Sequence, residues 1–428
     1  MTRKMKDSGI EWIGEIPDDW TVSKLKKVTE ILTCGYASTP EYFDDGIPFI
    51  SAQNVKNGRM DLSKYNKISK ELHNQLIKYK KPTKGDILQV RVGATIGNAC
   101  IVEEDFDFSI YVSLSHIRAT SEIYNYYLYY ILSSSTFISE ALNETYQGGG
   151  VGNLNVKQLK EMYVPVPEKS TQEQIAEYLT RKCMKIDQTI EKQKQLIEKL
   201  KEYKQSIITE VVTKGLNPDV KMRESGVEWI GEIPEHWAVK KLKYVFKTKK
   251  DIAGKEGYDI LSVTQSGIKI KDISNNDGQL SMDYSKYQLV EIDDYIMNHM
   301  DLLTGFVDCS KYQGVTSPDY RVFYLINNER NKDYYKHIFQ CCYRNRIFYG
   351  LGQGVSGLGR WRLQTDKFLN FYIPVPPNDE QAQIAEYINN KQIAIDKSIS
   401  QKEKLIQKLT EYKKSLIYEC VTGKREIQ

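Results

Sequence analysis

The chain repeats its own framework. Residues 7–20 read DSGIEWIGEIPDDW and residues 224–237 read ESGVEWIGEIPEHW, an offset of 217. Residues 163–178 read YVPVPEKSTQEQIAEY and residues 372–387 read YIPVPPNDEQAQIAEY, an offset of 209. The copied segments frame two middles that differ from each other. Such a repeat predicts two equivalent units that share their supports and differ in what those supports carry.

A long polar helix is predicted after each proline-rich segment. Ser170 with Glu173 gives a capping-box pattern, and Asp379 occupies the equivalent N-cap position in the second copy. Gly215 and Gly423 predict the two C-terminal ends. Apolar residues at alternating spacings of three and four form one seam along each helix: Ile186, Ile190, Ile197, Leu200, Ile207 and Val211, then Ile395, Ile399, Ile406, Leu409, Leu416 and Cys420.

Each seam needs a partner, because a lone amphipathic helix would leave its seam in water. The simplest partner is the other helix of the same chain, packed antiparallel, which would relate the two halves by a pseudo-twofold axis. A second copy of the chain, packed through the same seam, is the alternative.

The two middles are predicted to be α+β. Short β-like runs broken by turn residues recur in both, at residues 47–51, 87–92, 99–102, 112–118, 260–263 and 321–326. Tyrosine-rich helical stretches follow at residues 124–132 and 334–343. The predicted segments are residues 1–168 and 217–377 for the domains, and 169–216 and 378–428 for the helical regions.

Composition and motifs favour a binding protein over an enzyme. The net charge of +4 is mild, and the seven cysteines are scattered without a C-x-x-C pair, so neither a disulfide framework nor a metal site is indicated. No phosphate-binding loop or H-E-x-x-H is present. Gly352, Gly354 and Gly357 spell G-x-G-x-x-G without the strand and helix that dinucleotide binding requires. With no long apolar run or signal-peptide core, a cytoplasmic location without membrane contact is expected.

Loops rich in polar side chains are the candidate contacts to nucleic acid, since Arg, Asn and Gln read base edges while Lys mainly anchors the backbone. A glycine stretch also falls at the same place in both halves, at residues 147–153 and 352–357, where backbone could approach phosphate; a flexible connection is the alternative. The candidates in the first half are Tyr36, Ser38, Thr39, Gln53, Asn54, Lys56, Asn57, Arg59, Arg91, Thr95, Gln147 and Asn153. Those in the second half are Lys249, Lys250, Lys255, Gln265, Lys269, Lys271, Asn298, His299, Arg344, Arg346, Gln353, Ser356, Arg360 and Arg362.

The sequence resembles the DNA specificity subunits of type I restriction-modification systems over essentially its whole length. The resemblance rests on W-I-G-E-I-P-x-x-W at the start of each half, on [IV]-P-[VI]-P before Q-x-x-I-A-E-Y, and on G-D-I-L-x-x-R-x-G-x-x-I-G at residues 85–97. The second half departs from the last pattern at residues 294–305, which read DYIMNHMDLLTG.

The resemblance implies two target-recognition domains joined by two long helices packed as an antiparallel coiled coil. It implies a non-catalytic subunit whose domains each read one half of a split, asymmetric target in double-stranded DNA. The implied partners are two methyltransferase subunits, which use S-adenosylmethionine to methylate adenine, and two motor-nuclease subunits, which use ATP and Mg²⁺. No cofactor is expected on this chain itself. The alternative function is a coiled-coil scaffold without sequence-specific DNA binding.

Overall fold

The computed structural model describes residues 3–146, 152–272, 283–355 and 360–427. These residues form two compact units. Unit 1 comprises residues 1–193 and 403–428, and unit 2 comprises residues 194–402. Each unit therefore contains one domain, part of the helix that follows it, and part of the other long helix. This division concerns packing, and the four segments proposed from the sequence remain a prediction.

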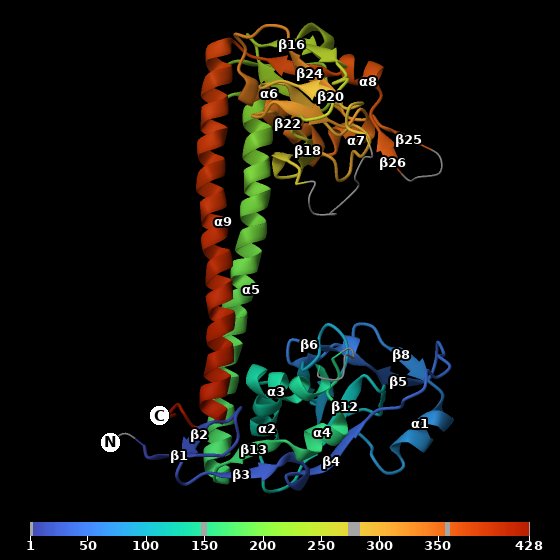
Figure 1. The fold of residues 1–428 in the computed structure, drawn as a ribbon, viewed down its shortest axis with the longest axis vertical. Helices are drawn as coiled ribbons and strands as arrows, with labels where there is room; N and C mark the ends of the chain where they lie inside the picture. Colours follow the sequence, from blue (N-terminus) through green and yellow to red (C-terminus); the bar gives the residue numbers. More distant parts are fainter. Residues whose placement is uncertain (1–2, 147–151, 273–282, 356–359, 428) are drawn as a thin grey trace. The chain divides into compact units, whose positions relative to one another are not determined.

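The first domain is built on a four-stranded antiparallel sheet in the order β10-β9-β12-β4 (Figure 1). Its central strand β9 is buried along its whole length, which explains why it reads as a continuous apolar run. The sheet strands are β4 (Thr29–Cys34), β9 (Ile87–Val90), β10 (Ala99–Ile101) and β12 (Leu114–Ala119). The runs predicted at residues 87–92, 99–102 and 112–118 are thus strands, each shorter than predicted.

Smaller sheets and helices complete the first domain. Strand β5, predicted at residues 47–51, pairs with β8 and β11 in a second sheet. The remaining strands are β1 (Met5–Asp7), β2 (Glu15–Pro17), β3 (Thr21–Lys24), β5 (Ile47–Ile50), β6 (Val55–Lys56), β7 (Arg59–Met60), β8 (Asn66–Ile68), β11 (Ser109–Ile110) and β13 (Tyr163–Val166). The helices are α1 (Lys70–Ile77), α2 (Asn125–Leu132), α3 (Ser135–Tyr146) and α4 (Val156–Glu161).

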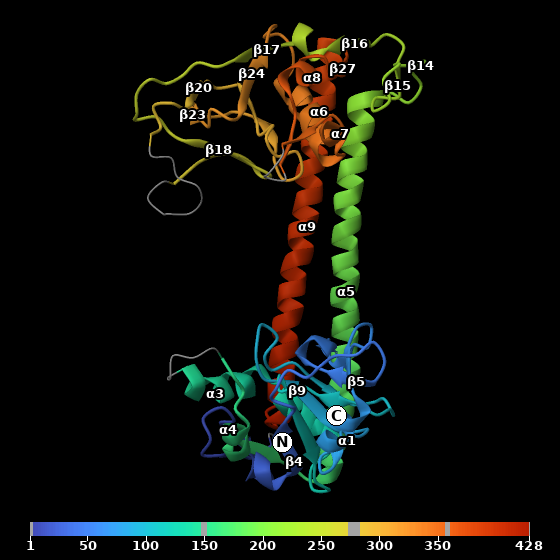
Figure 2. The same ribbon diagram turned by 90° about the vertical axis from the view of Figure 1, so that its right-hand side faces the viewer.

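The second domain repeats this plan. Its main sheet has the order β22-β21-β24-β17, which matches β10-β9-β12-β4 strand for strand, and Figure 2 shows β17 beside β24 with β20 and β23 as a separate pair. The sheet strands are β17 (Phe246–Lys249), β21 (Tyr295–Met297), β22 (Val307–Cys309) and β24 (Arg321–Leu325). The other strands are β14 (Met222–Glu224), β15 (Glu232–Pro234), β16 (Ala238–Lys241), β18 (Leu261–Thr264), β19 (Gly267–Ile270), β20 (Gln288–Val290), β23 (Gly314–Thr316), β25 (Gln353–Val355), β26 (Arg360–Arg362) and β27 (Tyr372–Val375). The helices are α6 (Lys332–Arg344), α7 (Ile347–Gly350) and α8 (Thr365–Leu369).

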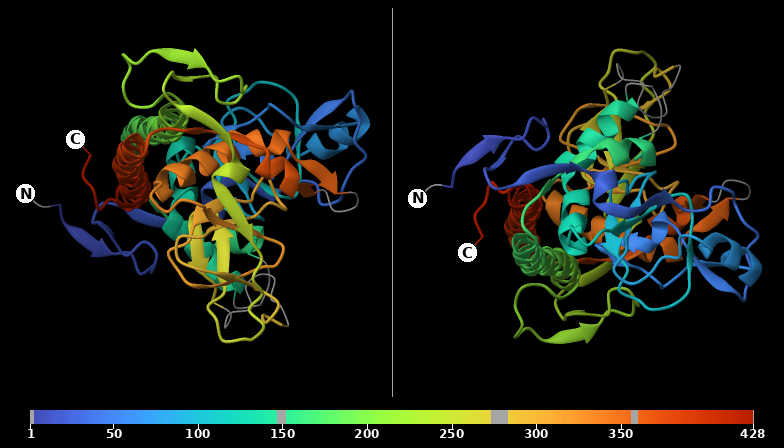
Figure 3. Two further views of the ribbon diagram at one scale, coloured as in Figure 1. Left: turned by 90° about the horizontal axis from the view of Figure 1, so that it is seen from above. Right: turned by 90° about the horizontal axis from the view of Figure 1, so that it is seen from below.

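The two long helices are α5 (Lys169–Lys214) and α9 (Asn378–Val421). In unit 1 the beginning of α5 shares a core with the end of α9, and in unit 2 the end of α5 shares a core with the beginning of α9. The helices therefore run antiparallel, and Figure 3 shows them side by side, seen end-on. Every predicted seam residue is buried or half-buried, which confirms the intramolecular coiled coil and removes the need for a second chain to cover the seam.

Polar contacts of the helix pair follow the repeat. In unit 1 Lys413 Nζ lies 2.6 Å from the Asp187 carboxylate, and in unit 2 Lys204 Nζ lies 2.7 Å from the Asp396 carboxylate. Each of these residues corresponds to another at an offset of 209. The two ion pairs are therefore one interaction formed once in each unit.

Each domain is fastened to the end of a long helix by a buried tyrosine. Tyr127 Oη donates to Val421 O at 2.9 Å in unit 1, and Tyr334 Oη donates to Val212 O at 3.1 Å in unit 2. The two acceptor residues are again 209 positions apart. The helix-ending Gly423 has a positive φ of 73°, and a Cβ there would lie 2.5 Å from Pro17 Cδ, so this close approach requires glycine.

Both long helices begin earlier than the capping patterns predicted. Ser170 and Asp379 are each the second residue of their helix, so neither is an N-cap. Buried glutamines stabilise these starts instead: Gln172 Nε2 donates to Pro167 O, and Gln381 Nε2 donates to Pro376 O, both at 2.8 Å. Within the residues that the structure describes, no helix is both long and apolar enough to span a membrane.

Candidate nucleic-acid interface

In the first domain, three segments meet at one end of the main sheet. The β6–β7 hairpin packs against β9 and β10 and turns at Asn57 and Gly58, which have φ of 52° and 75°. Positive φ at both turn positions is the mark of a tight type I′ hairpin, and Gly58 also lies close to Tyr129, since a Cβ there would come within 2.7 Å of its hydroxyl. The turn holds Lys56, Asn57 and Arg59 exposed; Lys56 also pairs with Asp61 at 2.6 Å.

The other two segments are the β9–β10 turn and the segment that precedes α4. Gly97 N donates to Val90 O at 2.9 Å and closes the turn, which leaves Thr95 exposed. Val92 forms a bridge with Asn153, so these two segments lie side by side. Tyr36 follows β4 at the same end of the sheet, where its carbonyl accepts a hydrogen bond from Val112 N at 2.9 Å. Candidates scattered over more than a hundred residues are thus gathered at one sheet end.

The equivalent end of the second domain also gathers predicted residues. Gln265, at the β18–β19 turn, donates to Thr304 O at 3.4 Å. Asn298 O accepts from Tyr343 Oη at 2.6 Å, and the guanidinium of Arg344 lies over the Phe306 ring, 5.6 Å from its centroid. Leu302 N donates to Trp361 O at 3.2 Å, which joins the turn after β21 to the β25–β26 hairpin.

The remaining candidates have mixed placements. Ser38, Thr39, Gln53, Lys250, Lys255, Lys269, Arg346, Gln353 and Arg362 are exposed, and Lys271 is half-buried. Lys249 is half-buried in an ion pair with Asp294. Gln147 and Ser356 lie outside the described residues, as does the side chain of Arg360.

Three predicted DNA contacts do not fit their positions. Asn54 is 1% exposed, and its amide donates to Asp61 O and Lys64 O inside the domain. Arg91 is buried with its guanidinium bound to groups of its own domain. His299 is also buried, and burial, followed by the charges of Arg321 and Arg362, lowers its pKa to about 3. These side chains stabilise their own domains from within and are poorly placed to touch DNA.

A buried charge network supports the first sheet and was missed by sequence reasoning. Asp86 accepts from His116 Nε2 at 2.6 Å and from Arg118 through both carboxylate oxygens, at 2.7 and 2.8 Å. Burial raises the pKa of this carboxyl, but the hydrogen bonds from Arg118 and His116 outweigh burial and lower the pKa to about 2. The only sequence signal was the G-D-I-L motif itself.

The equivalent carboxyl in the second domain has a different environment. Asp294 lies before β21 and pairs with Lys249, without a histidine or arginine among its ion-pair partners in the described chain. Here burial dominates and raises the pKa, although the hydrogen bond from Lys249 opposes it. The difference arises on the neighbouring strand, where Val322 lies opposite Ile296 in the place that His116 takes opposite Leu88. The electrostatics at the start of β21 therefore differ from those at the start of β9.

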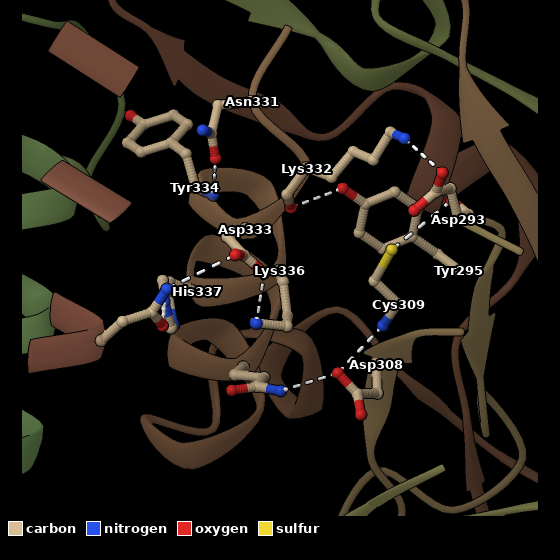
Figure 4. Close-up of polar contacts among 12 residues, drawn as sticks. Asp293, Tyr295, Asp308, Cys309, Asn331, Lys332, Asp333, Tyr334, Lys336 and His337 are labelled. Carbon is tan, nitrogen blue, oxygen red and sulfur yellow. Dashed lines mark hydrogen bonds and ion pairs between the residues drawn. The ribbon is translucent and has the colours of Figure 1, made fainter. Parts of the chain in front are cut away.

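A polar cleft of about 860 Å³ in unit 2 runs between α6, β22 and the helix pair. Figure 4 shows its wall at the start of α6, where Lys332 pairs with Asp293 and Lys336 pairs with Asp333; Asp308 belongs to β22. Six basic and five acidic side chains line the cleft, so its charge is nearly balanced. This balance gives no reason to expect phosphate in it. In the parts of the chain that the structure describes, no group of three His, Cys, Asp or Glu side chains is arranged to hold a metal ion.

Two copies of one framework, each with a cluster of exposed polar loops at the same sheet end, define a two-domain recognition protein. The chain belongs to the type I restriction-modification DNA specificity domain family, whose sequence pattern matches residues 17–202 and 234–411. A family defined by a DNA specificity domain lends no support to the alternative of a scaffold that does not read DNA.

Relatives and solved structures agree with this membership. The chain is 29% identical over 250 residues to the type I restriction enzyme MjaIX specificity subunit of Methanocaldococcus jannaschii, covering 55% of this chain and 54% of the relative. It is 32% identical over 163 residues to the EcoBI specificity subunit of Escherichia coli, covering 37% and 34%. The matched region thus spans about half of these relatives or less.

The fold is that of solved specificity subunits. A chain from a structural study of type I restriction-modification complex assembly superposes with a TM-score of 0.69 at 13% identity, covering 96% of this chain and 99% of that chain. The HsdS subunit of Thermoanaerobacter tengcongensis gives 0.54 at 12% identity, covering 96% and 98%. At these identities the likeness concerns the fold alone.

Proposed function

We propose that this chain is the DNA-reading subunit of a type I restriction-modification complex. Each domain reads one half of a bipartite, asymmetric double-stranded target and directs adenine methylation, and cleavage where a nuclease partner is present. The observation that carries this proposal is the pair of sheet ends with equivalent supports and different exposed side chains. Two different readers on one repeated framework are what an asymmetric split target requires, and the spacing of half-sites follows from how the readers are joined.

The chain itself contributes recognition and no chemistry in this proposal. S-adenosylmethionine belongs to the methyltransferase partner, and ATP and Mg²⁺ belong to the motor-nuclease partner. The cytoplasmic location expected from the sequence remains a prediction.

Exposed apolar residues on the helices support two copies of one partner. Three such residues on α5 correspond, each at an offset of 209, to three on α9: Met184 with Ile393, Leu196 with Leu405, and Tyr203 with Tyr412. Leu196 and Tyr203 are seven residues apart, so they share a helix face, as do Leu405 and Tyr412. Equivalent surfaces make equivalent contacts, so two methyltransferase subunits are proposed to dock here. Two motor-nuclease subunits complete the proposed complex.

Substitution on each helix tests this stoichiometry. L196D should remove one methyltransferase and L405D the other, so that native mass spectrometry of the complex shows a loss of one copy in each case. E202K and E411K, at exposed polar positions that are also 209 apart but lie away from the face of Leu196 and Leu405, are the matched controls. Loss of both copies from one substitution, or of neither, contradicts two independent docking surfaces.

Methylation-aware sequencing of the host genome, with and without this gene, tests the proposed function. One split adenine motif should disappear on deletion. Replacing residues 21–150 with the first domain of another family member should then change one half of that motif only. An unchanged methylome, with the gene and its methyltransferase both expressed, contradicts the proposal.

A further inference from the structure

One backbone carbonyl in each domain is held by a buried arginine. In the first domain Arg91 Nε donates to Leu154 O at 3.0 Å, and in the second Arg321 Nη2 donates to Leu363 O at 3.0 Å. Leu154 and Leu363 are equivalent in the repeat, at an offset of 209. A guanidinium therefore binds the same carbonyl in both domains.

The two arginines do not occupy equivalent positions. Arg91 directly follows β9, and Leu154 N donates to Arg91 O at 2.9 Å. In the second domain the corresponding bond runs from Leu363 N to His299 O at 3.0 Å, so His299 occupies the position of Arg91. The second domain has histidine, and not arginine, at this position.

The second arginine comes from the neighbouring strand. Arg321 lies on β24 opposite Met297 of β21. The equivalent pair in the first domain is Ser115 opposite Gln89, and the buried Ser115 Oγ has no hydrogen-bond partner among the residues that the structure describes. The guanidinium of the second domain thus comes from the neighbouring strand, and it binds the equivalent carbonyl.

Both guanidinium groups bind neutral acceptors. Arg91 also donates to Val112 O at 3.0 Å and to Asn153 Oδ1 at 3.4 Å, and Arg321 also donates to Thr365 Oγ1 at 3.3 Å. Burial lowers the pKa of Arg321 to about 10, which leaves it protonated at neutral pH. A buried cation without a carboxylate is costly, so stability alone does not explain why each domain has one.

The carbonyl that the arginine binds, Leu154 O or Leu363 O, lies beside the end of β9 or β21, where the candidate DNA-contacting loops begin. In the sequence it directly follows Asn153 in the first domain and the exposed Arg362 in the second. Beyond it the chain passes through α4 or α8 to the strand that precedes a long helix. A guanidinium has several N–H donors in a rigid plane, so it can fix this segment against the end of the sheet.

We propose that Arg91 and Arg321 are positioning residues for sequence reading, each acting on its own domain through this carbonyl and neither touching DNA. This inference rests on the proposed function. It predicts that each of the two residues is needed for sequence discrimination at a different half-site. It also predicts that the guanidinium can be moved to the neighbouring strand without loss of that discrimination.

The test uses the complex with its methyltransferase and duplexes with one half-site scrambled at a time. Arg91→Ala should lower discrimination at one half-site at least tenfold and leave the other within twofold, and Arg321→Ala should do the reverse. The slope of log affinity against log salt concentration should stay unchanged, whereas loss of a phosphate contact would reduce it by about 0.9. Discrimination that survives both substitutions, or is lost at both half-sites together, overturns the inference.

A variant that moves the arginine to the neighbouring strand distinguishes a positioning role from a general loss of folded structure. The first domain carrying R91H with S115R copies the arrangement of the second, so it should regain discrimination that R91A lacks at the same half-site. If R91A does not fold, the comparison uses R91K, whose single ammonium cannot bridge the same acceptors and should reduce discrimination at least threefold. A folded relocation variant without discrimination contradicts the inference. If the unsubstituted complex itself fails to distinguish target from scrambled DNA, the proposed function fails instead.

Discussion

Asp86 and Asp294 occupy equivalent positions in the two domains and should respond differently to loss of their charge. The perturbation is Asp86→Asn, with Asp294→Asn as its matched partner. Both substitutions keep the size of the side chain and remove one negative charge. The Asp86 carboxylate is 3% exposed and accepts hydrogen bonds from two basic side chains, whereas Asp294 is 6% exposed and pairs with a single lysine.

The size of the effect follows from the pKa of Asp86. A fall from 3.8 to about 2 corresponds to about 2.5 kcal/mol of folding stability at neutral pH. Because the folded pKa is below the unfolded value, this contribution is present above about pH 4 and is lost as the pH falls towards 2. The pKa of Asp294 is raised, so its charge does not stabilise the fold at neutral pH.

Hydrogen exchange followed by mass spectrometry measures the two effects separately, because peptides from β9 and β21 report on different units. At pH 7, D86N should lower protection in β9 by about 2.5 kcal/mol, and D294N should lower protection in β21 by less than half as much. The stability of D86N should also vary less between pH 5 and pH 3 than that of the unsubstituted chain. Equal costs for the two substitutions would refute the reasoning from the charge network.

Two further predictions concern the helix ends. The buried Trp20 Nε1 has no hydrogen-bond partner in the described part of the chain, whereas the equivalent Trp237 Nε1 donates to Glu380 Oε2 at 2.9 Å. Thr171 corresponds to Glu380, so a glutamine at this position could accept a hydrogen bond from the Trp20 indole. T171Q should therefore add about 1 kcal/mol to the unfolding free energy of unit 1, measured by urea titration. No gain would mean that the side chain cannot reach the indole. Inserting four residues, about 6 Å of helix, near Gly215 should lengthen the unread DNA spacer and leave both read halves unchanged, as the methylome would show; an unaltered spacer would contradict a spacing role.

Local periodicity predicted the framework well. The seam residues from Ile186 to Leu416 are buried or half-buried as expected, because a spacing of three and four residues reports directly on one helix face. The helix starts were less well predicted. Ser170 fits a local capping rule, but the chain enters the helix before it because Gln172 satisfies backbone groups of a neighbouring loop, a tertiary contact that local sequence does not encode.

The candidate site could be predicted only as a set of loops. Gln53 and Asn54 are adjacent and chemically alike, yet the first is exposed and the second is 1% exposed with its amide fully used. The pattern of polar residues does not reveal which side chains turn inward to bond the domain's own backbone. The hydrogen bond from Arg321 to Leu363 O could not be predicted for the same reason, since it joins segments 42 residues apart.

The composition of the two units has a consequence for biosynthesis. Unit 2 is one continuous stretch, residues 194–402, so all of its core residues are available once residue 402 has left the ribosome. Unit 1 also needs residues 403–428. The Tyr127 hydroxyl and the apolar side chains around it have no packing partner until Leu416 to Val421 have been synthesised. The N-terminal domain is therefore made first and completed last, and until then an apolar surface shaped for the end of α9 stays open to solvent or to a chaperone.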